Sequence, residues 1–162
     1  MMNTREKICI WLFDKSKLPY AKHFKKNKQE WTVSRETLLS YPNGTLGFEM
    51  GSFLFSKDFE MIPKLERHDA YHVITGIGTD VADEIALQFF FLGNGKRSLY
   101  LFGVVILGAL LMPEFYYKYF SAFYKGKYAN PLYPMDIEAM LFENLSDIQS
   151  QIFTHSLHYQ HN

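Results

Sequence analysis

The chain has few of the features that mark several large classes of protein. Cys9 is its only cysteine, which excludes an internal disulfide and a thiolate zinc cluster. Lys and Arg together number 17, and so do Asp and Glu, so there is no overall basic field and no nucleic-acid partner is expected. The longest charge-free stretch covers residues 98–113, whereas a membrane-spanning helix needs about 20 mostly apolar residues. A single spanning helix is therefore not expected.

The N-terminal apolar run is short, and Glu6, Lys7 and Asp14 interrupt it. Because no small-residue cleavage site follows, the sequence predicts no secretory signal and a cytoplasmic location. A length of 162 residues suits one domain that buries its own core. We expect a single helical domain over residues 1–153 and a flexible C-terminal tail over residues 154–162.

Apolar residues recur mainly at helical spacing, and strand-like alternation is hard to find. The sequence therefore predicts an all-α fold, an orthogonal bundle of about six to seven helices with a metal-bearing helical hairpin. One helix is expected to begin at Pro63, and an aromatic helix to run from Pro113 to an end at Gly126. A last helix is expected from Pro134, with its apolar stripe formed by Ile137, Leu141, Leu145, Ile148 and Ile152.

Gly47 and Gly51 lie four residues apart on one face of a predicted helix. Glycine inside a helix costs about 1 kcal/mol relative to alanine, so a compensating reason is expected. The usual reason is close approach of another backbone or of a ligand.

Four potential metal ligands occur within a short stretch: His68, Asp69, His72 and Glu84. On one helix, His68 and His72 differ by about 40° around the axis, so both face the same side. A continuous helix would put Glu84 about 18 Å from His72, far beyond ligand distances of about 2 Å. Gly76 and Gly78, however, predict a helical hairpin at which the chain folds back. The hairpin would bring His72 and Glu84 level with each other.

Two imidazoles with one or two carboxylates would bind one divalent metal ion and leave a coordination position open. Zinc is the favoured ion, with iron or manganese as alternatives. Asp69 is a candidate ligand, a partner that orients a histidine, or a general base. The competing interpretation is that both histidines belong to the core and bind no metal.

The motif H-D-x-x-H followed by eleven residues and Glu, here His68, Asp69, His72 and Glu84, resembles the signature of the coenzyme Q (ubiquinone) biosynthesis protein 4 family. The stretches "YPNGTLGFEMGSFL", "HDAYHVITGI" and "DEIALQFF" are also similar to segments of that family, and the resemblance covers roughly residues 41–152. It suggests a distant member of bacterial type. The chain departs from the family pattern at Ala70, where an aromatic residue is usual, and at Asp83, where glycine is usual.

The resemblance implies an all-helical, dimeric protein that binds a divalent metal and an isoprenoid-tailed quinone precursor or lipid. It also implies contact with other quinone-biosynthesis enzymes and with the inner face of the membrane as a peripheral protein. The metal ligands would be His68, Asp69, His72 and Glu84, with Asp69 as the catalytic residue. The substrate or lipid contacts would be Gly47, Gly51 and Tyr71.

Two functions fit this resemblance. The first is a metal-dependent oxidative decarboxylase or hydroxylase of a prenylated hydroxybenzoate in quinone biosynthesis. The second is a noncatalytic lipid-binding scaffold that organises quinone-biosynthesis enzymes and holds a structural metal.

Overall fold

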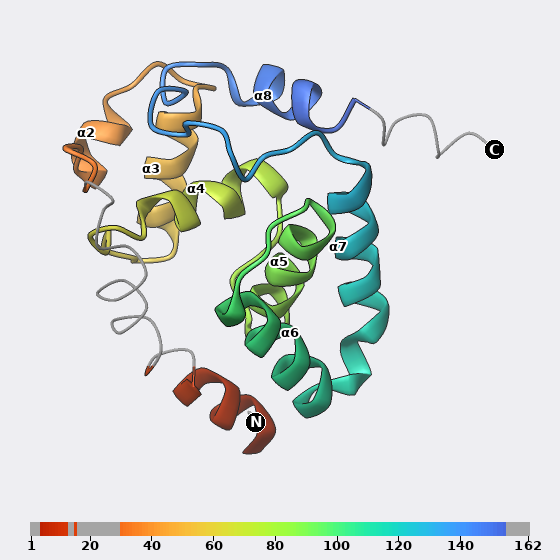
Figure 1. Cartoon of the computed structure of the whole chain (residues 1–162). Coiled ribbons are helices and arrows are strands. Elements are labelled where there is room, and N and C mark those ends of the chain that lie inside the picture. The colour runs from red at the N-terminus through yellow and green to blue at the C-terminus, as the bar shows by residue number, and fades with distance from the viewer. Residues whose placement is uncertain (1–3, 13–14, 16–29, 155–162) are drawn as a thin grey trace. The chain divides into compact units, whose positions relative to one another are not determined.

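The computed structural model describes residues 4–12, 15 and 30–154. Over these residues the chain is helical and contains no strand, which confirms the predicted all-α class (Figure 1). Residues 4–12 are helical. The helices that follow are α2 (Arg35–Leu39), α3 (Leu46–Ser56), α4 (Glu66–Thr75), α5 (Val81–Gly93), α6 (Leu99–Leu111), a 3-10 turn η1 (Pro113–Phe115), α7 (Tyr116–Tyr128) and α8 (Leu145–Ile152).

Two compact units can be distinguished in the chain. Of the described residues, the α2–α4 unit comprises 30–76 and 136–150, and the α5–α7 unit comprises 4–12, 15, 77–135 and 151–154. The single-domain organisation expected for residues 1–153 stays a prediction. Apart from Thr154, the predicted tail of residues 154–162 lies outside the described residues.

Local sequence signals set the starts of three helices. The hydroxyls of Ser34, Thr45 and Ser98 accept hydrogen bonds from backbone N–H groups in the first turns of α2, α3 and α6. Such caps satisfy donors that have no partner within the helix. At the other end of α4, Gly76 adopts a left-handed conformation with φ of 67° and donates its N–H to His72 O. This is the chain break that the glycine predicted.

The start of α4 differs from the prediction, because the helix begins at Glu66 rather than at Pro63. Lys64 has a positive φ of 69°, which a continuing helix does not allow. The carboxylate of Glu66 is buried and accepts hydrogen bonds from the backbone N–H groups of Lys64 and Trp31. Glu66 thus holds the turn that replaces the predicted first turn of the helix.

The predicted last helix is also shorter than expected, since only α8 forms and residues 133–143 make turns. Backbone donors at the start of α3 explain the break. Leu46 N–H binds Glu143 O at 2.9 Å and Gly47 N–H binds Leu141 O at 2.8 Å. Those carbonyls are therefore turned toward α3, and Ile137 and Leu141 are buried without being helical.

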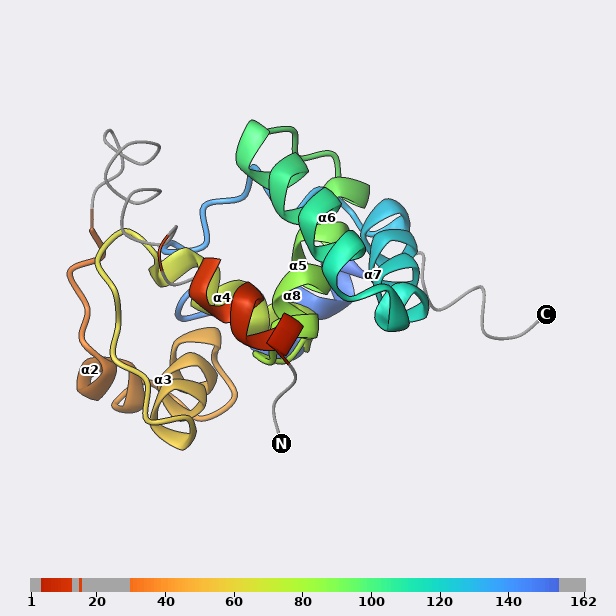
Figure 2. The ribbon, with the colours of Figure 1, turned by 90° about the horizontal axis from the view of Figure 1, so that it is seen from below.

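In the α5–α7 unit, α7 runs beside α5 (Figures 1 and 2). A Cβ added at Gly126 would lie 2.0 Å from Phe90 O, and one added at Gly93 would lie 2.1 Å from Phe123 O. The two glycines thus let the helix backbones approach closely where they pack. This corrects the prediction that Gly126 ends the aromatic helix, because α7 continues through it to Tyr128.

Helix α6 contacts α5 where Gly108 meets the side chain of Ile85. Buried Asn94, which follows α5, donates to Gly126 O and accepts from Leu132 N–H. Its amide therefore ties the end of α5 to the chain that leaves α7.

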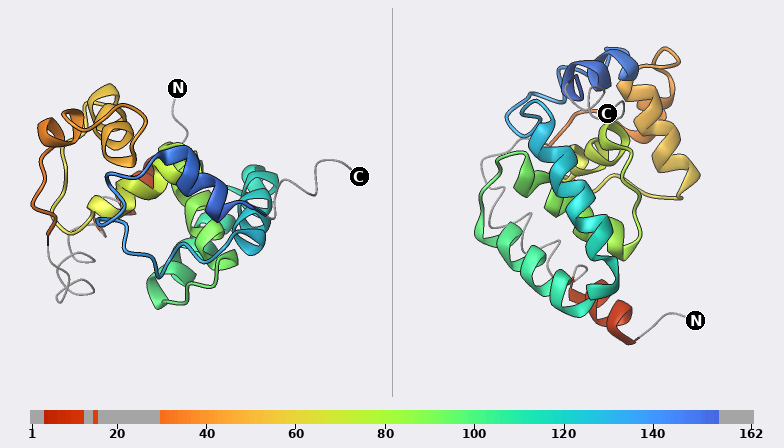
Figure 3. Two further views of the ribbon diagram at one scale, coloured as in Figure 1. Left: turned by 90° about the horizontal axis from the view of Figure 1, so that it is seen from above. Right: turned by 90° about the vertical axis from the view of Figure 1, so that its right-hand side faces the viewer.

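Across the described residues, no single helix is long and apolar enough to cross a bilayer. One pair passes the same test only when taken together, Leu99–Leu111 with Pro113–Tyr128, and it is bent by 103°. Figure 3 shows this bend where green-to-teal α6 meets cyan α7.

Candidate metal centre

Helix α4 presents the two histidines of the motif on one face, as their four-residue spacing requires. The ring centroids of His68 and His72 are 4.7 Å apart and the ring planes make an angle of 73°. His72 is buried, and the ring of Phe53 from α3 lies nearly parallel to it, with 6.1 Å between ring centroids. The His68 side chain is about one third exposed, at 32%. One imidazole is therefore fixed in the core while the other remains accessible.

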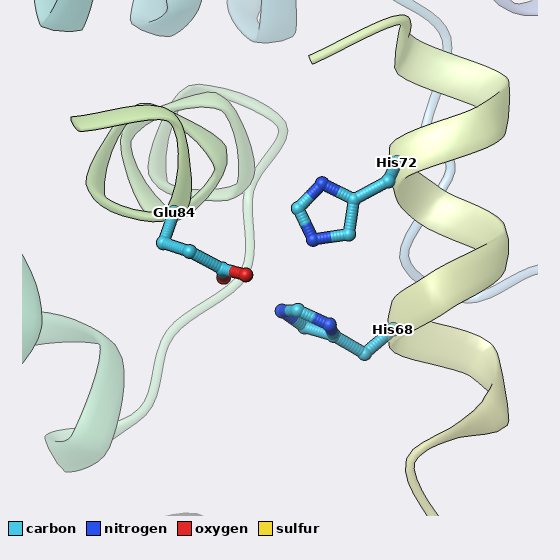
Figure 4. Close-up of side chains that lie close together, drawn as sticks. All are labelled: His68, His72 and Glu84. Carbon is cyan, nitrogen blue, oxygen red and sulfur yellow. The ribbon is translucent and has the colours of Figure 1, made fainter. Parts of the chain in front are cut away.

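Glu84, in the first turn of α5, completes a group with these histidines. Each of the three residues offers one ligand atom, and these atoms all lie within 4.8 Å of one another. Figure 4 shows the carboxylate of Glu84 and both imidazoles pointing toward one another. The group can hold a metal ion, with two imidazole nitrogens and one carboxylate oxygen as donors.

Asp69, the fourth predicted ligand, does not belong to this group of three. Its Oδ1 lies 3.7 Å from Nδ1 of His68, and its side chain is 20% exposed. A carboxylate beside a histidine nitrogen is the arrangement that orients metal-binding imidazoles in many sites. At 3.7 Å this pair is longer than a hydrogen bond, so the role of Asp69 as ligand, orienting partner or base stays a prediction.

The residues expected to contact substrate or lipid lie elsewhere on α3 and α4. A Cβ added at Gly47 would lie 2.3 Å from the ring of Tyr41, and one added at Gly51 would lie 2.8 Å from Leu39 N. Both glycines therefore permit close packing of protein against α3. Tyr71 is buried, and the guanidinium of Arg67 lies 5.6 Å from its ring centroid. The role of these three residues in binding a ligand stays a prediction.

Gln88 is a polar residue of α5 that is not among the site residues predicted from the sequence. It is buried within the apolar run "IALQFFFL", and its side-chain oxygen has no hydrogen-bond partner among the described residues. The available signal was its spacing, since Gln88 follows Glu84 by four residues and so shares a helix face with it.

Comparison with solved structures shows where the fold recurs. The chain is similar to a crystal structure from Nostoc punctiforme PCC 73102, of a protein provisionally assigned to ubiquinone biosynthesis, with a TM-score of 0.66 and 18% identity. The match covers 93% of this chain and 82% of that one. No protein-family model and no curated protein matches the chain. At this identity, the likeness is one of fold.

Proposed function

We propose that this protein binds one divalent metal ion, with zinc favoured, and acts on or presents a prenylated aromatic ring in quinone biosynthesis. The observation that carries the proposal is the group of His68, His72 and Glu84, whose ligand atoms lie within 4.8 Å. The fold shared with the Nostoc punctiforme protein and the motif spacing in the sequence support the same association.

The donor set fits a zinc site of the catalytic type, in which three protein ligands leave a position for water or substrate. Asp69, next to Nδ1 of His68, is proposed to fix the orientation of that ring so that Nε2 is the coordinating nitrogen. Phe53 stacks on His72 and holds the second ring against α3. When bound, the ion supplies Lewis-acid polarisation of ring oxygens of the ligand.

Metal analysis of the purified full chain tests this proposal directly. We expect close to one divalent ion per chain, strong loss of metal in His72→Ala and in Glu84→Gln, and retention in Glu138→Gln, which changes an exposed glutamate outside the group. The proposal fails if the wild-type chain binds no stoichiometric ion, or if His72→Ala binds as much as the wild type.

The proposed function has a catalytic version, in which the protein converts the prenylated ring, and a scaffold version, in which it only binds the ring. If zinc-loaded or iron-loaded protein converts a prenylated hydroxybenzoate and Glu84→Gln does not, the protein is an enzyme. If loaded protein binds the prenylated ring but releases no carbon dioxide and forms no hydroxylated product, the scaffold version holds. Native mass spectrometry that finds no isoprenoid bound under any condition would remove both versions.

We also propose that the α5–α7 unit contacts an anionic lipid surface. Helix α6 has no charged residue, yet it exposes Leu99, Ile106, Leu107 and Leu110 at 87%, 57%, 51% and 69%. Helix α7 adds exposed tyrosines and three lysines, with no acidic residue in its sequence. Apolar side chains beside tyrosine and lysine are typical of surfaces that insert shallowly into a membrane interface.

Flotation with vesicles of phosphatidylglycerol and phosphatidylcholine tests this contact. We expect Ile106→Lys to reduce the vesicle-bound fraction several-fold, whereas Phe55→Lys, at a similarly exposed apolar residue of α3, should not. Equal binding of both variants and the wild type would contradict the proposed surface. If a second copy of the chain covers this surface instead, the wild type should bind no vesicles. The oligomeric mass of Ile106→Lys in solution should then differ from that of the wild type.

A further inference from the structure

Helix α5 buries a hydrogen-bond acceptor, the side-chain oxygen of Gln88. The residue is 6% exposed, and its Oε1 has no partner among the described residues. Burial of an acceptor without a donor is unfavourable, so a group of this kind in a folded protein calls for an explanation. Its neighbours Leu87 and Phe89 are apolar and buried, so Gln88 is the polar exception in this part of α5.

Gln88 lies one helical turn after Glu84, which belongs to the candidate metal centre. At 3.6 residues and 5.4 Å per turn, Gln88 lies about 6 Å along the axis from Glu84 and about 40° around it. The contacts of α5 with α7 are made by other positions: Asp83 pairs with Lys118, and Phe90 O meets Gly126.

Those contacts define which face of α5 carries Gln88. Phe89 stacks on Tyr119 of α7, with 5.0 Å between ring centroids, and Ile85 meets Gly108 of α6. At 100° per residue, Glu84 and Gln88 point away from the side of α5 that α7 covers. Gln88 thus lies on the same side of the helix as Glu84.

We propose that Gln88 recognises the ligand of the metal centre, by accepting a hydrogen bond from a hydroxyl group on its aromatic ring. This inference rests on the proposed function and specifies a ligand that carries a phenolic O–H. A carboxamide suits this task because its oxygen accepts a hydrogen bond from a neutral hydroxyl and the group itself stays uncharged as pH changes. A site that offers a buried acceptor also discriminates against an analogue that lacks the donor.

The test compares two probes that differ by one hydroxyl, 4-hydroxybenzoate and benzoate, by calorimetric titration of the zinc-loaded full chain. We expect the wild type to bind 4-hydroxybenzoate about tenfold more tightly, the size of one good hydrogen bond. In Gln88→Met, which keeps the length but not the acceptor, the preference should fall to near unity through weaker binding of 4-hydroxybenzoate alone. Gln88→Asn, which moves the amide back by one methylene, should also lose the preference for 4-hydroxybenzoate. This variant replaces Gln88→Met in the test if Gln88→Met does not fold.

Two controls separate recognition from a structural role. Tyr119→Phe removes another buried polar group that has no hydrogen-bond partner among the described residues, on α7, and should leave the tenfold preference unchanged. The melting temperature of metal-free Gln88→Met should equal or exceed that of the wild type, because an unpaired acceptor has been removed. A lower melting temperature with equal losses for both probes would instead mean that Gln88 is structural, for example through a buried water.

The failure of this inference can be told from the failure of the proposed function. Gln88→Met should hold as much zinc as the wild type, measured separately by metal analysis. If the loaded wild type binds both probes equally, or neither, the role of Gln88 is wrong while the metal site stands. If the wild type holds no metal, the proposed function itself is wrong.

Discussion

Replacement of Gly126 by alanine should destabilise the protein by separating α5 from α7. The added methyl carbon would lie 2.0 Å from Phe90 O and 2.8 Å from Phe90 C, where ordinary contact is 3.4–4 Å. The obstructing atoms belong to the backbone of α5, so no side-chain rotation relieves the overlap. Overpacking of this kind costs about 1–3 kcal/mol, and this geometry favours the upper end of that range.

Alanine also favours the helical state over glycine, by about 1 kcal/mol, and this offsets part of the overlap. The net loss expected for Gly126→Ala is therefore about 2 kcal/mol, which corresponds to a fall in melting temperature of roughly 4–8 °C for a chain of this size. Gly103→Ala in α6 is the matched control, since a Cβ there meets nothing within 4 Å. It should raise the melting temperature by roughly 2–4 °C.

Thermal unfolding followed by circular dichroism at 222 nm measures both variants under one condition. The reasoning is refuted if Gly126→Ala melts at or above the wild-type temperature, or if both variants shift in the same direction. Gly93→Ala offers a second test of the same helix contact, because its Cβ would lie 2.1 Å from Phe123 O.

Three further outcomes are expected. Burial raises the pKa of the Tyr119 phenol above its ordinary value of 10.0, so above pH 10 the unfolded phenol ionises while the folded one keeps its proton. Wild-type stability should consequently fall relative to Tyr119→Phe as pH rises through 10, which chemical denaturation at pH 8, 10 and 11 would reveal; parallel curves would contradict this. Glu66→Ala should cost about 1–3 kcal/mol, because two backbone N–H groups lose their acceptor, whereas exposed Glu138→Ala should stay within about 0.5 kcal/mol of the wild type in urea unfolding. Asp69→Asn should weaken zinc binding by about 10- to 100-fold in competition with a chelator, and an unchanged affinity would mean that Asp69 does not orient His68.

Much of the candidate centre could be predicted from the sequence because its determinants are local. Two histidines four apart face the same side of any α-helix, and Gly76 marks the end of α4 through its left-handed conformation. The distance from His72 to Glu84 could then be judged from helix rise alone. Helix spacing alone, however, did not decide which of the four candidates come together. It allowed Asp69 beside the two histidines, whereas the group of three contains His68, His72 and Glu84.

The sequence by itself determined the all-α class, the hydroxyl caps of α2, α3 and α6, and the break between α4 and α5, since each depends on residues within one or two turns. Only the tertiary structure decided that α7 continues through Gly126 and that the last helix loses its first half. The reason is the same in both cases. Parts of the chain distant in sequence decide both: α5 packs so closely at Gly126 that only glycine fits there within α7, and the Leu46 and Gly47 N–H groups bind carbonyls that a longer last helix would use. The side-chain oxygen of Gln88, which has no partner among the described residues, likewise depends on the packing around it, and the sequence spacing does not predict this.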